Sequence, residues 1–160
     1  MSSLTKREIE YVRSQFLGRL ATIGPDGLPH VVPVGFRYDP EQDTIDIGGH
    51  DFAKRKKWRD VHANPNVAFV VDDVATLPRP LMRVIAPIFR MAYRRFGARM
   101  RARQRRGASA PRNPLWAPRG VEIRGTAEVL ASGGKQVNAF FDDEMFRIHP
   151  TKVISWGVNE

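Results

Sequence analysis

The chain has 160 residues, of which 42% are hydrophobic, a length and composition that fit one domain with a substantial core. It contains no cysteine, which excludes disulfides and thiolate metal sites and favours a reducing environment. The N-terminal stretch lacks the apolar core of a signal peptide, and no run of about 18 apolar residues occurs. We therefore expect a soluble, cytoplasmic protein without a membrane span.

The net charge of +9 is concentrated in one segment of the chain. Residues 77–114 contain eleven Arg and no Lys, Asp or Glu, which leaves 15 of the 26 basic residues against 17 acidic residues elsewhere. The rest of the chain is therefore slightly acidic. Overall charge accordingly gives no ground for predicting a specific nucleic-acid partner.

Residues 5–16 are predicted to form a short amphipathic helix. Thr5 and Glu8 have the spacing of a capping box. Apolar residues recur after them at helical intervals, at Ile9, Val12 and Phe16. Gly18 is expected to end the helix.

Two apolar, β-branched runs follow, separated by Pro25-Asp26-Gly27, which is the composition of a hairpin turn. Pro29 and Pro33 lie in the second run, and each would remove a backbone donor from a sheet. The second strand is therefore expected to run near an edge, or to bend where its backbone faces a ligand.

The later segments predict further strands. A turn at residues 39–43 precedes a third strand, Thr44–Ile47, and Val67–Val71 is expected to be a strand buried on both faces. Beyond the Arg-rich segment, Gly120–Leu130 alternates as a strand with a bulge or kink at Gly125. Two closing strands are predicted, Met145–Ile148 and Val153–Trp156. Six or so short strands at this spacing, with few helices, predict a mainly β protein built as a closed antiparallel barrel.

A basic segment, residues 48–65, lies between the third and fourth strands. Gly48-Gly49-His50 is a turn signal, and Asp51 is a plausible N-cap for a helix that ends before Asn64-Pro65. Five cations crowd its first turns: Lys54, Arg55, Lys56, Lys57 and Arg59. Cations at a helix start repel the positive end of the helix dipole unless an anion offsets them, so the segment suggests a phosphate or carboxylate site. A solvated basic face is the alternative interpretation.

In their order along the chain, several blocks of sequence resemble the pyridoxamine-phosphate-oxidase-like split barrels. They are most similar to the branch found in actinobacteria that depends on the deazaflavin coenzyme F420. The blocks are RLATIGPDGLPHVVPVGF, DIGGHD, KKWRDVHANPNVAFVVDD, WAPRGVEIRGTAEV and FRIHPTKVISWGV. The resemblance covers roughly residues 5–75 and 116–158. It implies a six-stranded split β-barrel of the FMN-binding type, forming a homodimer with the cofactor in a groove at the subunit interface.

The resemblance also implies which residues bind the cofactor. The anionic tail would be held by Arg55, Lys57, Trp58 and Arg59, with Lys54 and Lys56 adjacent. The ring would meet the backbone of the second strand and the turn after the third strand, at Val32, Pro33, Val34, Gly48, Gly49 and His50. Trp156 falls where the family tends to line the cleft, although a core aromatic is an equally good interpretation of a tryptophan there.

The chemistry implied by this resemblance belongs mainly to the cofactor. The expected activity is hydride transfer from reduced F420 to an unsaturated or conjugated small molecule, with no protein nucleophile. Residues 142–144 are acidic but are expected to form a solvated turn rather than an acid–base pair. The four histidines lack metal-ligand spacing, so no metal is predicted, and His50 alone is a candidate for contact with tail or substrate. Two alternatives stay open: a carrier that binds F420 or haem without turnover, and an FMN-dependent oxidase.

The Arg-rich segment departs from the family pattern, because relatives have a short connection there. It is interpreted as an insert, at about residues 75–115, that interrupts a single split-barrel domain spanning residues 1–160. Pro87 is placed to start a basic amphipathic helix whose apolar positions are Ile88, Phe89, Ala92, Tyr93, Phe96 and Met100. The insert could be a lid over the cofactor, could lie on an anionic membrane, or could bind nucleic acid nonspecifically.

Overall fold

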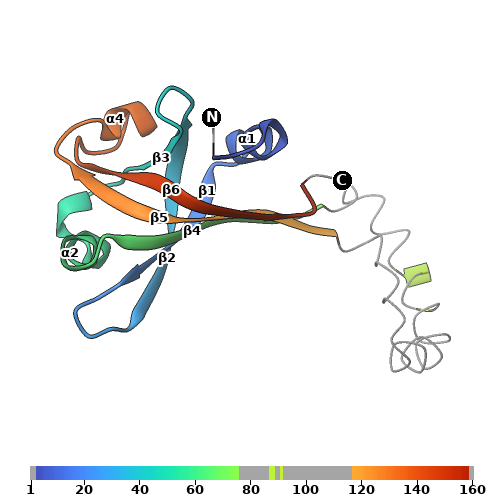
Figure 1. Ribbon diagram of the computed structural model, residues 1–160, viewed down its shortest axis with the longest axis horizontal. Helices are drawn as coiled ribbons and strands as arrows, with labels where there is room; N and C mark the ends of the chain where they lie inside the picture. Colours follow the sequence, from blue (N-terminus) through green and yellow to red (C-terminus); the bar gives the residue numbers. More distant parts are fainter. Residues whose placement is uncertain (1–2, 76–86, 89–90, 92–116, 159–160) are drawn as a thin grey trace. The chain divides into compact units, whose positions relative to one another are not determined.

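The computed structural model describes residues 3–75, 87–88, 91 and 117–158 (Figure 1). Its elements, in chain order, are α1 (Lys6–Arg13), β1 (Leu17–Ile23), β2 (Pro29–Asp39), β3 (Thr44–Ile47), the 3-10 helix η1 (Phe52–Lys54), α2 (Lys56–Ala63), β4 (Asn66–Ala75), β5 (Ala117–Leu130), α4 (Gly134–Val137) and β6 (Met145–Trp156). The amphipathic helix predicted in the Arg-rich insert lies outside the described residues, apart from residues 87–88 and 91.

Six strands close into one antiparallel barrel, in the order β1-β2-β3-β6-β5-β4 (Figure 1). Each strand therefore has a neighbour on both sides over part of its length, and closure leaves no long free sheet edge. The fold class predicted from the sequence is confirmed. Helices connect the strands or lie outside the barrel, so the protein is mainly β.

The first helix has the predicted capping box. The Thr5 hydroxyl accepts from the backbone N–H of Glu8, and the Glu8 carboxylate accepts from the N–H of Thr5 at 2.7 Å. The predicted end of the helix was wrong, because α1 stops at Arg13 and Gly18 lies inside β1. A side chain at Gly18 would collide with the buried ring of Phe69, so this glycine provides space for core packing and does not end a helix.

The hairpin at Pro25-Asp26-Gly27 is confirmed, with β1 and β2 paired in antiparallel register from Ile23↔Pro29 to Leu17↔Gly35. On its other side, β2 pairs with β3 only from Phe36 to Asp39. Among the described residues, residues 29–35 of β2 have no strand partner on that side. This agrees with the edge position that Pro29 and Pro33 predicted.

The C-terminal strands differ from the prediction in one respect. A register shift in the pairing of β5 with β6 lies between Arg124 and Gly125, as the predicted bulge requires. The two predicted closing strands are one twelve-residue strand, β6, which continues through Pro150.

The fourth strand was predicted to be buried on both faces. Instead Val67, Phe69 and Val71 are buried, whereas the residues between them are only partly buried, because β4 has one face toward the core.

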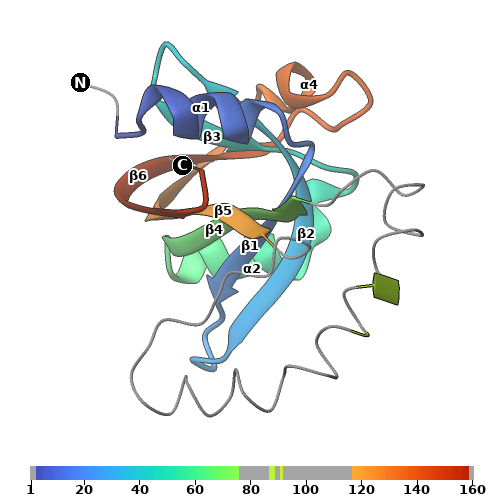
Figure 2. The ribbon, with the colours of Figure 1, turned by 90° about the vertical axis from the view of Figure 1, so that its right-hand side faces the viewer.

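The barrel interior is filled by aliphatic and aromatic side chains from all six strands. Phe36 and Phe69 meet edge to face at 5.0 Å between ring centroids, and Phe52 meets Phe146 at 4.8 Å. Outside the barrel, α1 packs against β2, α2 against β1, and α4 against β2 and β3 (Figures 1 and 2). Both α2 and α4 lie at the same end of the barrel in Figure 1, and this end contains most of the predicted site.

Two compact units divide the chain, one of residues 1–72 with 120–160 and the other of residues 73–119. Within the second, Arg119 forms a bidentate ion pair with Asp73, at 2.7 and 2.9 Å. No helix in the described part of the chain is long and apolar enough to cross a membrane.

Candidate functional site

The basic segment is built as a turn, a short 3-10 helix and then α2. Asp51 has φ 50° and ψ 39°, in the left-handed region that Asp tolerates better than most residues. Asp51 stands at the N-cap position of η1, as predicted, but its side chain caps no backbone N–H, and α2 begins only after Arg55. Asp51 instead accepts a hydrogen bond from the Lys54 ammonium at 2.8 Å, which lowers the pKa of this exposed carboxyl and raises the pKa of Lys54. Lys54 is therefore already paired with an anion of the chain itself.

The second paired cation of the segment is Lys56. Its ammonium donates to both carboxylate oxygens of Asp60, at 2.9 and 3.1 Å, one helical turn along α2. Asp60 is only 1% exposed and also accepts from the Thr22 hydroxyl of β1 at 2.9 Å. His30 of β2 approaches the same carboxylate at 3.4 Å. Asp60 thus links α2 to the first hairpin, and its ion pair with Lys56 already occupies that ammonium group.

Lys57 and Trp58 lie toward the protein interior. The Lys57 ammonium lies 4.6 Å from the centre of the Phe52 ring, and burial, with a smaller effect from Arg55, lowers the pKa of Lys57. The Trp58 ring stacks on Phe146 at 5.4 Å and meets Phe52 edge to face at 5.8 Å. Trp58 therefore packs against the core, and Lys57 is a desolvated cation near its surface.

Arg55 and Arg59 lie one turn apart at the start of α2, on the same face of the helix. Arg55 donates from Nε to the backbone carbonyl of His50 at 3.2 Å and lies 4.0 Å from Asp51. Both arginines are exposed. No side chain caps the N-terminus of α2, and the N–H of Trp58 donates to the Arg55 carbonyl at 3.1 Å. The N–H groups of Lys56 and Lys57 and these two guanidinium groups remain available to an anion.

The predicted ring-side residues on β2 can offer only backbone atoms. The Val34 side chain is buried in the core, and Val32 packs against the core. Pro33 points outward and is exposed. The unpaired stretch of β2 therefore presents a backbone edge, which is a suitable partner for the amide-like edge of a planar ring.

The turn after β3 packs against the loop formed by residues 138–144. The backbone N–H of Asp142 donates to the Gly49 carbonyl at 3.1 Å, and the Asp142 carboxylate accepts from the N–H of Phe52 at 3.1 Å. The Phe141 ring meets His50 edge to face at 5.5 Å. The three predicted residues of this turn, Gly48 to His50, are thus held by a loop that the sequence left as a solvated acidic turn.

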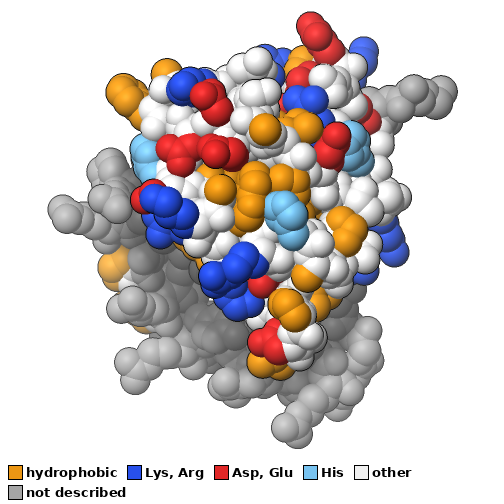
Figure 3. Space-filling view, turned by 90° about the vertical axis from the view of Figure 1, so that its left-hand side faces the viewer, with side chains coloured by type: hydrophobic (Ala, Val, Ile, Leu, Met, Phe, Trp, Pro, Cys, Tyr) orange, Lys and Arg blue, Asp and Glu red, His pale blue; other side chains and the backbone are white. Residues whose placement is uncertain are grey.

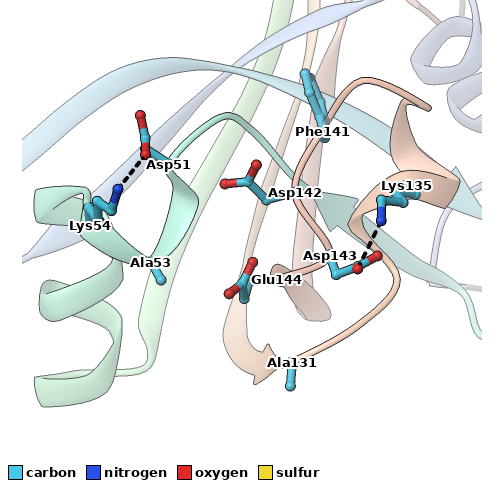
Figure 4. Close-up of a pocket in the computed structure, with 9 residues that line it drawn as sticks. All are labelled: Asp51, Ala53, Lys54, Ala131, Lys135, Phe141, Asp142, Asp143 and Glu144. Carbon is cyan, nitrogen blue, oxygen red and sulfur yellow. Dashed lines mark hydrogen bonds and ion pairs between the residues drawn. The ribbon is translucent and has the colours of Figure 1, made fainter.

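A cleft of about 590 Å³ opens between η1 and this loop (Figure 4). Asp142 and Glu144 point toward η1 across it, and Lys135 pairs with Asp143 at 3.0 Å (Figure 4). Its lining residues are Asp51, Ala53, Lys54, Ala131, Lys135, Phe141, Asp142, Asp143 and Glu144. On the face shown in Figure 3, acidic side chains and Lys and Arg side chains lie beside one another around a central apolar area. Among the described residues, no three His, Asp or Glu side chains are placed to hold a metal ion.

Trp156 lies apart from the basic segment. It pairs with Gly120 of β5, and a side chain at Gly120 would collide with its ring. The part of β6 that pairs with β3 ends at Ile148, so Trp156 lies roughly 25 Å further along the strand at about 3.3 Å per residue. Its side chain is 38% exposed. Trp156 is therefore a surface aromatic of the barrel wall, and the fold does not bring it to Gly48–Arg59 of the same chain.

Sequence reasoning missed three residues that shape this site: Asp60, Phe141 and Asp142. The spacing of Lys56 and Asp60 is that of a helical ion pair, and this signal was available from the sequence. Nothing local marked Phe141 or Asp142, because their partners are about ninety residues away along the chain.

The fold and the site together define a split barrel with a basic helix start beside an open backbone edge. The family model for pyridoxamine 5'-phosphate oxidase matches residues 4–157, and the chain belongs to this family. A relative from Streptomyces rimosus, a 5a,11a-dehydrotetracycline/5a,11a-dehydrooxytetracycline reductase, is 36% identical over 154 residues, which are 96% of this chain and 83% of the relative.

Solved structures share the fold at lower identity. A conserved hypothetical protein from Mycobacterium tuberculosis superposes with a TM-score of 0.59 at 20% identity, covering 96% of this chain and 84% of its own. An F420 reductase superposes with a TM-score of 0.57 at 20% identity, covering 94% of this chain and 98% of its own. These two likenesses concern the fold.

Proposed function

We propose that this protein is an F420-dependent oxidoreductase that reduces an activated double bond in a conjugated small molecule. An oxidoreductase is supported by the family and by the relative named as a reductase. F420 is favoured by the sequence blocks that resemble the deazaflavin branch. The observation that carries the proposal is the exposed pair Arg55 and Arg59 at an uncapped helix N-terminus.

The residues present fit such a cofactor. F420 has a planar tricyclic ring and a long tail with several negative charges. The tail suits Arg55, Arg59 and Lys57, because two arginines can bind phosphate or carboxylate in bidentate fashion and Lys57 is already desolvated. Lys54 and Lys56 are less suited than these three, because each already donates a close hydrogen bond to a carboxylate, to Asp51 at 2.8 Å and to Asp60 at 2.9 Å, whereas Arg55 lies 4.0 Å from Asp51.

The ring suits the unpaired backbone edge of β2 at Val32–Val34 and the turn at Gly48–His50. When bound in its reduced form, the deazaflavin supplies a hydride from the central carbon of its ring. The chain then needs to orient the ring, exclude water and hold the acceptor flat against it. Arg55 also links the two halves of the site, because it donates to the His50 carbonyl while its guanidinium faces outward.

The acceptor class follows from the relative. Its name denotes reduction of the 5a,11a double bond of a dehydrotetracycline, which is a polycyclic, conjugated molecule. We expect this protein to accept a hydrophobic conjugated ketone of comparable shape rather than a small polar acid.

The first test is a titration of cofactor-free protein with F420, with FMN and with the tail-less deazaflavin chromophore, followed by tryptophan fluorescence. F420 should bind more tightly than FMN, because its tail offers more anionic groups to α2. The double substitution Lys57→Ala with Arg59→Ala should weaken F420 at least about tenfold and leave the tail-less chromophore unaffected. The charge-matched control is Lys6→Ala with Arg13→Ala, on α1. F420 affinity that stays within twofold in the first variant would show that the tail assignment is wrong.

The same titration separates the alternatives. Preferential binding of FMN would favour an oxidase like the one that gives the family its name. F420 binding without consumption of reduced F420, tested over a panel of conjugated ketones, would favour a carrier. Haem binding would appear as a Soret band on addition of haem to the protein.

A homodimer is also part of this proposal. The outer face of the first hairpin exposes Leu17 and Val31 at 59% and 60%, and Ile23 at 39%. Ile23 and Val31 lie near each other on this face, whereas Leu17 lies four residues further along β1 than the partner of Val31, beyond Arg19. Exposed apolar side chains on a sheet face favour a protein partner, and a second copy would enclose a cofactor ring against β2. A second copy could also bring its own Trp156 toward the site.

A further inference from the structure

The ring of Phe141 packs on the outer side of the barrel, over Gly35 of β2 and over Gly48, which follows β3. A Cβ atom added at Gly35 of β2 would lie 3.0 Å from the tip of this ring, and one added at Gly48 would lie 2.9 Å from its side. At Gly35 the ring of Phe141 is all that such an atom would meet within 4 Å. The two glycines therefore leave space that Phe141 occupies.

Neither glycine is required by its backbone conformation. The described glycines with positive φ are Gly27, Gly133 and Gly157. Gly35 and Gly48 thus have φ angles that other residues adopt, and the close approach of an aromatic ring is the reason for a missing side chain. In the sequence, Gly48 was interpreted as a point of close backbone approach to a cofactor. The structure shows that a ring from the chain itself occupies this space.

The loop that supplies Phe141 is fixed at several points. The N–H of Phe141 donates to the Asn138 carbonyl at 2.9 Å, and Asp142 makes two hydrogen bonds to Gly49 and Phe52. His50 meets the ring edge to face. The neighbouring Phe140 is 83% exposed. The loop therefore turns one phenylalanine into the fold and leaves the other in solvent.

Phe141 lies over the point where β2 and β3 begin to diverge. Pairing of the two strands begins at Phe36↔Ile47, directly after Gly35 and directly before Gly48. Residues 29–35 of β2, on the other side of this point, pair with β1 but with no second strand in the described part of the chain. Phe141 therefore stands at the inner end of the open backbone edge to which the cofactor ring was assigned.

We propose that Phe141 is a positioning residue that closes the inner end of this edge and fixes how far the cofactor ring can slide along β2. Its partner is a planar, tricyclic, flavin-like ring, which would meet the phenyl ring edge to face. This inference rests on the proposed function, because it takes the open edge of β2 as the ring site.

The test compares Phe141→Ala with Phe140→Ala, two substitutions of the same chemistry at adjacent positions. Phe141→Ala should weaken both F420 and the tail-less chromophore about 3- to 10-fold, because an aromatic contact to the ring is lost. It should also shift the absorbance band of the bound ring. Phe140→Ala should bind as the unsubstituted protein does, and Phe141→Tyr should restore most of the affinity. Loss of chromophore binding distinguishes this role from that of Lys57 and Arg59, which contact the tail.

The outcomes separate this inference from the proposed function. If the unsubstituted protein binds neither F420 nor FMN, both are wrong. If it binds F420 and folded Phe141→Ala binds within twofold of it, the role of Phe141 alone is wrong. If Phe141→Ala does not fold, Gly35→Ala takes its place. Its methyl group displaces the Phe141 ring by a few tenths of an ångström and should weaken the chromophore measurably, whereas unchanged affinity would overturn the inference.

Discussion

Single residues decide which cations of the basic segment can meet a ligand. The predicted tail motif covers four positions, Arg55, Lys57, Trp58 and Arg59, with Lys54 and Lys56 adjacent, but the surroundings of these six side chains differ. Lys54 and Lys56 are exposed but pair closely with Asp51 and Asp60, at 2.8 and 2.9 Å, and Trp58 packs against Phe52 and Phe146. Arg55 is exposed and lies 4.0 Å from Asp51, whereas Arg59 is exposed and has no ion pair among the described residues. Charge density in the sequence therefore overstates the number of groups available to an anion.

Asp60 gives a prediction at this scale. Burial raises the pKa of Asp60, but hydrogen bonds from Lys56 and Thr22 and the charge of Lys56 lower it by more, so the net shift is downward. A carboxyl with a lowered pKa stabilises the fold above its unfolded pKa of about 3.9 and loses that contribution as pH falls through the folded pKa. Asp60→Asn should therefore cost about 1–3 kcal/mol of unfolding free energy at pH 7.

The difference in unfolding free energy between the unsubstituted protein and Asp60→Asn should shrink as pH falls below about 4, because the Asp60 carboxyl of the folded protein becomes protonated. Urea denaturation at several pH values measures it. Glu10→Gln on the exposed side of α1 is the control, with a small effect expected at each pH. A cost for Asp60→Asn that does not change with pH would contradict the electrostatic account.

At the scale of elements, three glycines of this fold are required for three different structural reasons. Gly125 lies at the register shift between β5 and β6, where a Cβ would lie 2.0 Å from the His149 carbonyl. Gly27 has positive φ in the hairpin turn. Gly18 leaves room for the Phe69 ring of β4. The sequence identified the first two from local composition, whereas the third depends on a strand fifty residues away.

Gly18→Ala tests the third reason, that Gly18 leaves room for the Phe69 ring. A Cβ at this position would lie 2.2 Å from the Phe69 ring, so the buried ring or the strand has to move. We expect a loss of about 1–3 kcal/mol of unfolding free energy, as for other overpacked cores. Phe69→Leu on its own should also destabilise the barrel. The double variant should lose less than the sum of both, because the smaller side chain leaves room for the methyl group.

Chemical denaturation of the four proteins gives this comparison. If Gly18 had ended a helix, the loss of unfolding free energy caused by Gly18→Ala would not depend on which side chain occupies position 69. Strict additivity of the two costs would therefore contradict the packing explanation.

At the scale of the whole molecule, the exposed apolar face of the first hairpin is the feature that a single barrel leaves unexplained. Leu17 and Val31 point out of the barrel on neighbouring strands. Burial of such residues in a second copy would remove apolar surface from water, at about 25 cal/mol per Å². It would also place two chains around the open edge of β2.

Val31→Glu tests the proposed dimer. A charge buried without a partner in an interface is costly, so the substitution should convert a dimer into a folded monomer. Sedimentation velocity measures the mass, and circular dichroism confirms that the barrel remains folded. Gln136→Glu, which adds the same charge on α4, should leave the dimer intact. A monomeric unsubstituted protein, or a dimeric Val31→Glu, would show that this face is not the interface.

The sequence by itself determined the strands, the hairpin turn, the capping box and the bulge at Gly125, because these follow from local periodicity and turn chemistry. It also determined the family, since its blocks match in order along most of the chain. Only the tertiary structure decided which cations already pair with a carboxylate, where β2 has no second strand beside it among the described residues, and that Phe141 packs over Gly35 and Gly48. Those features depend on contacts between residues far apart in the chain, and local patterns do not encode such contacts.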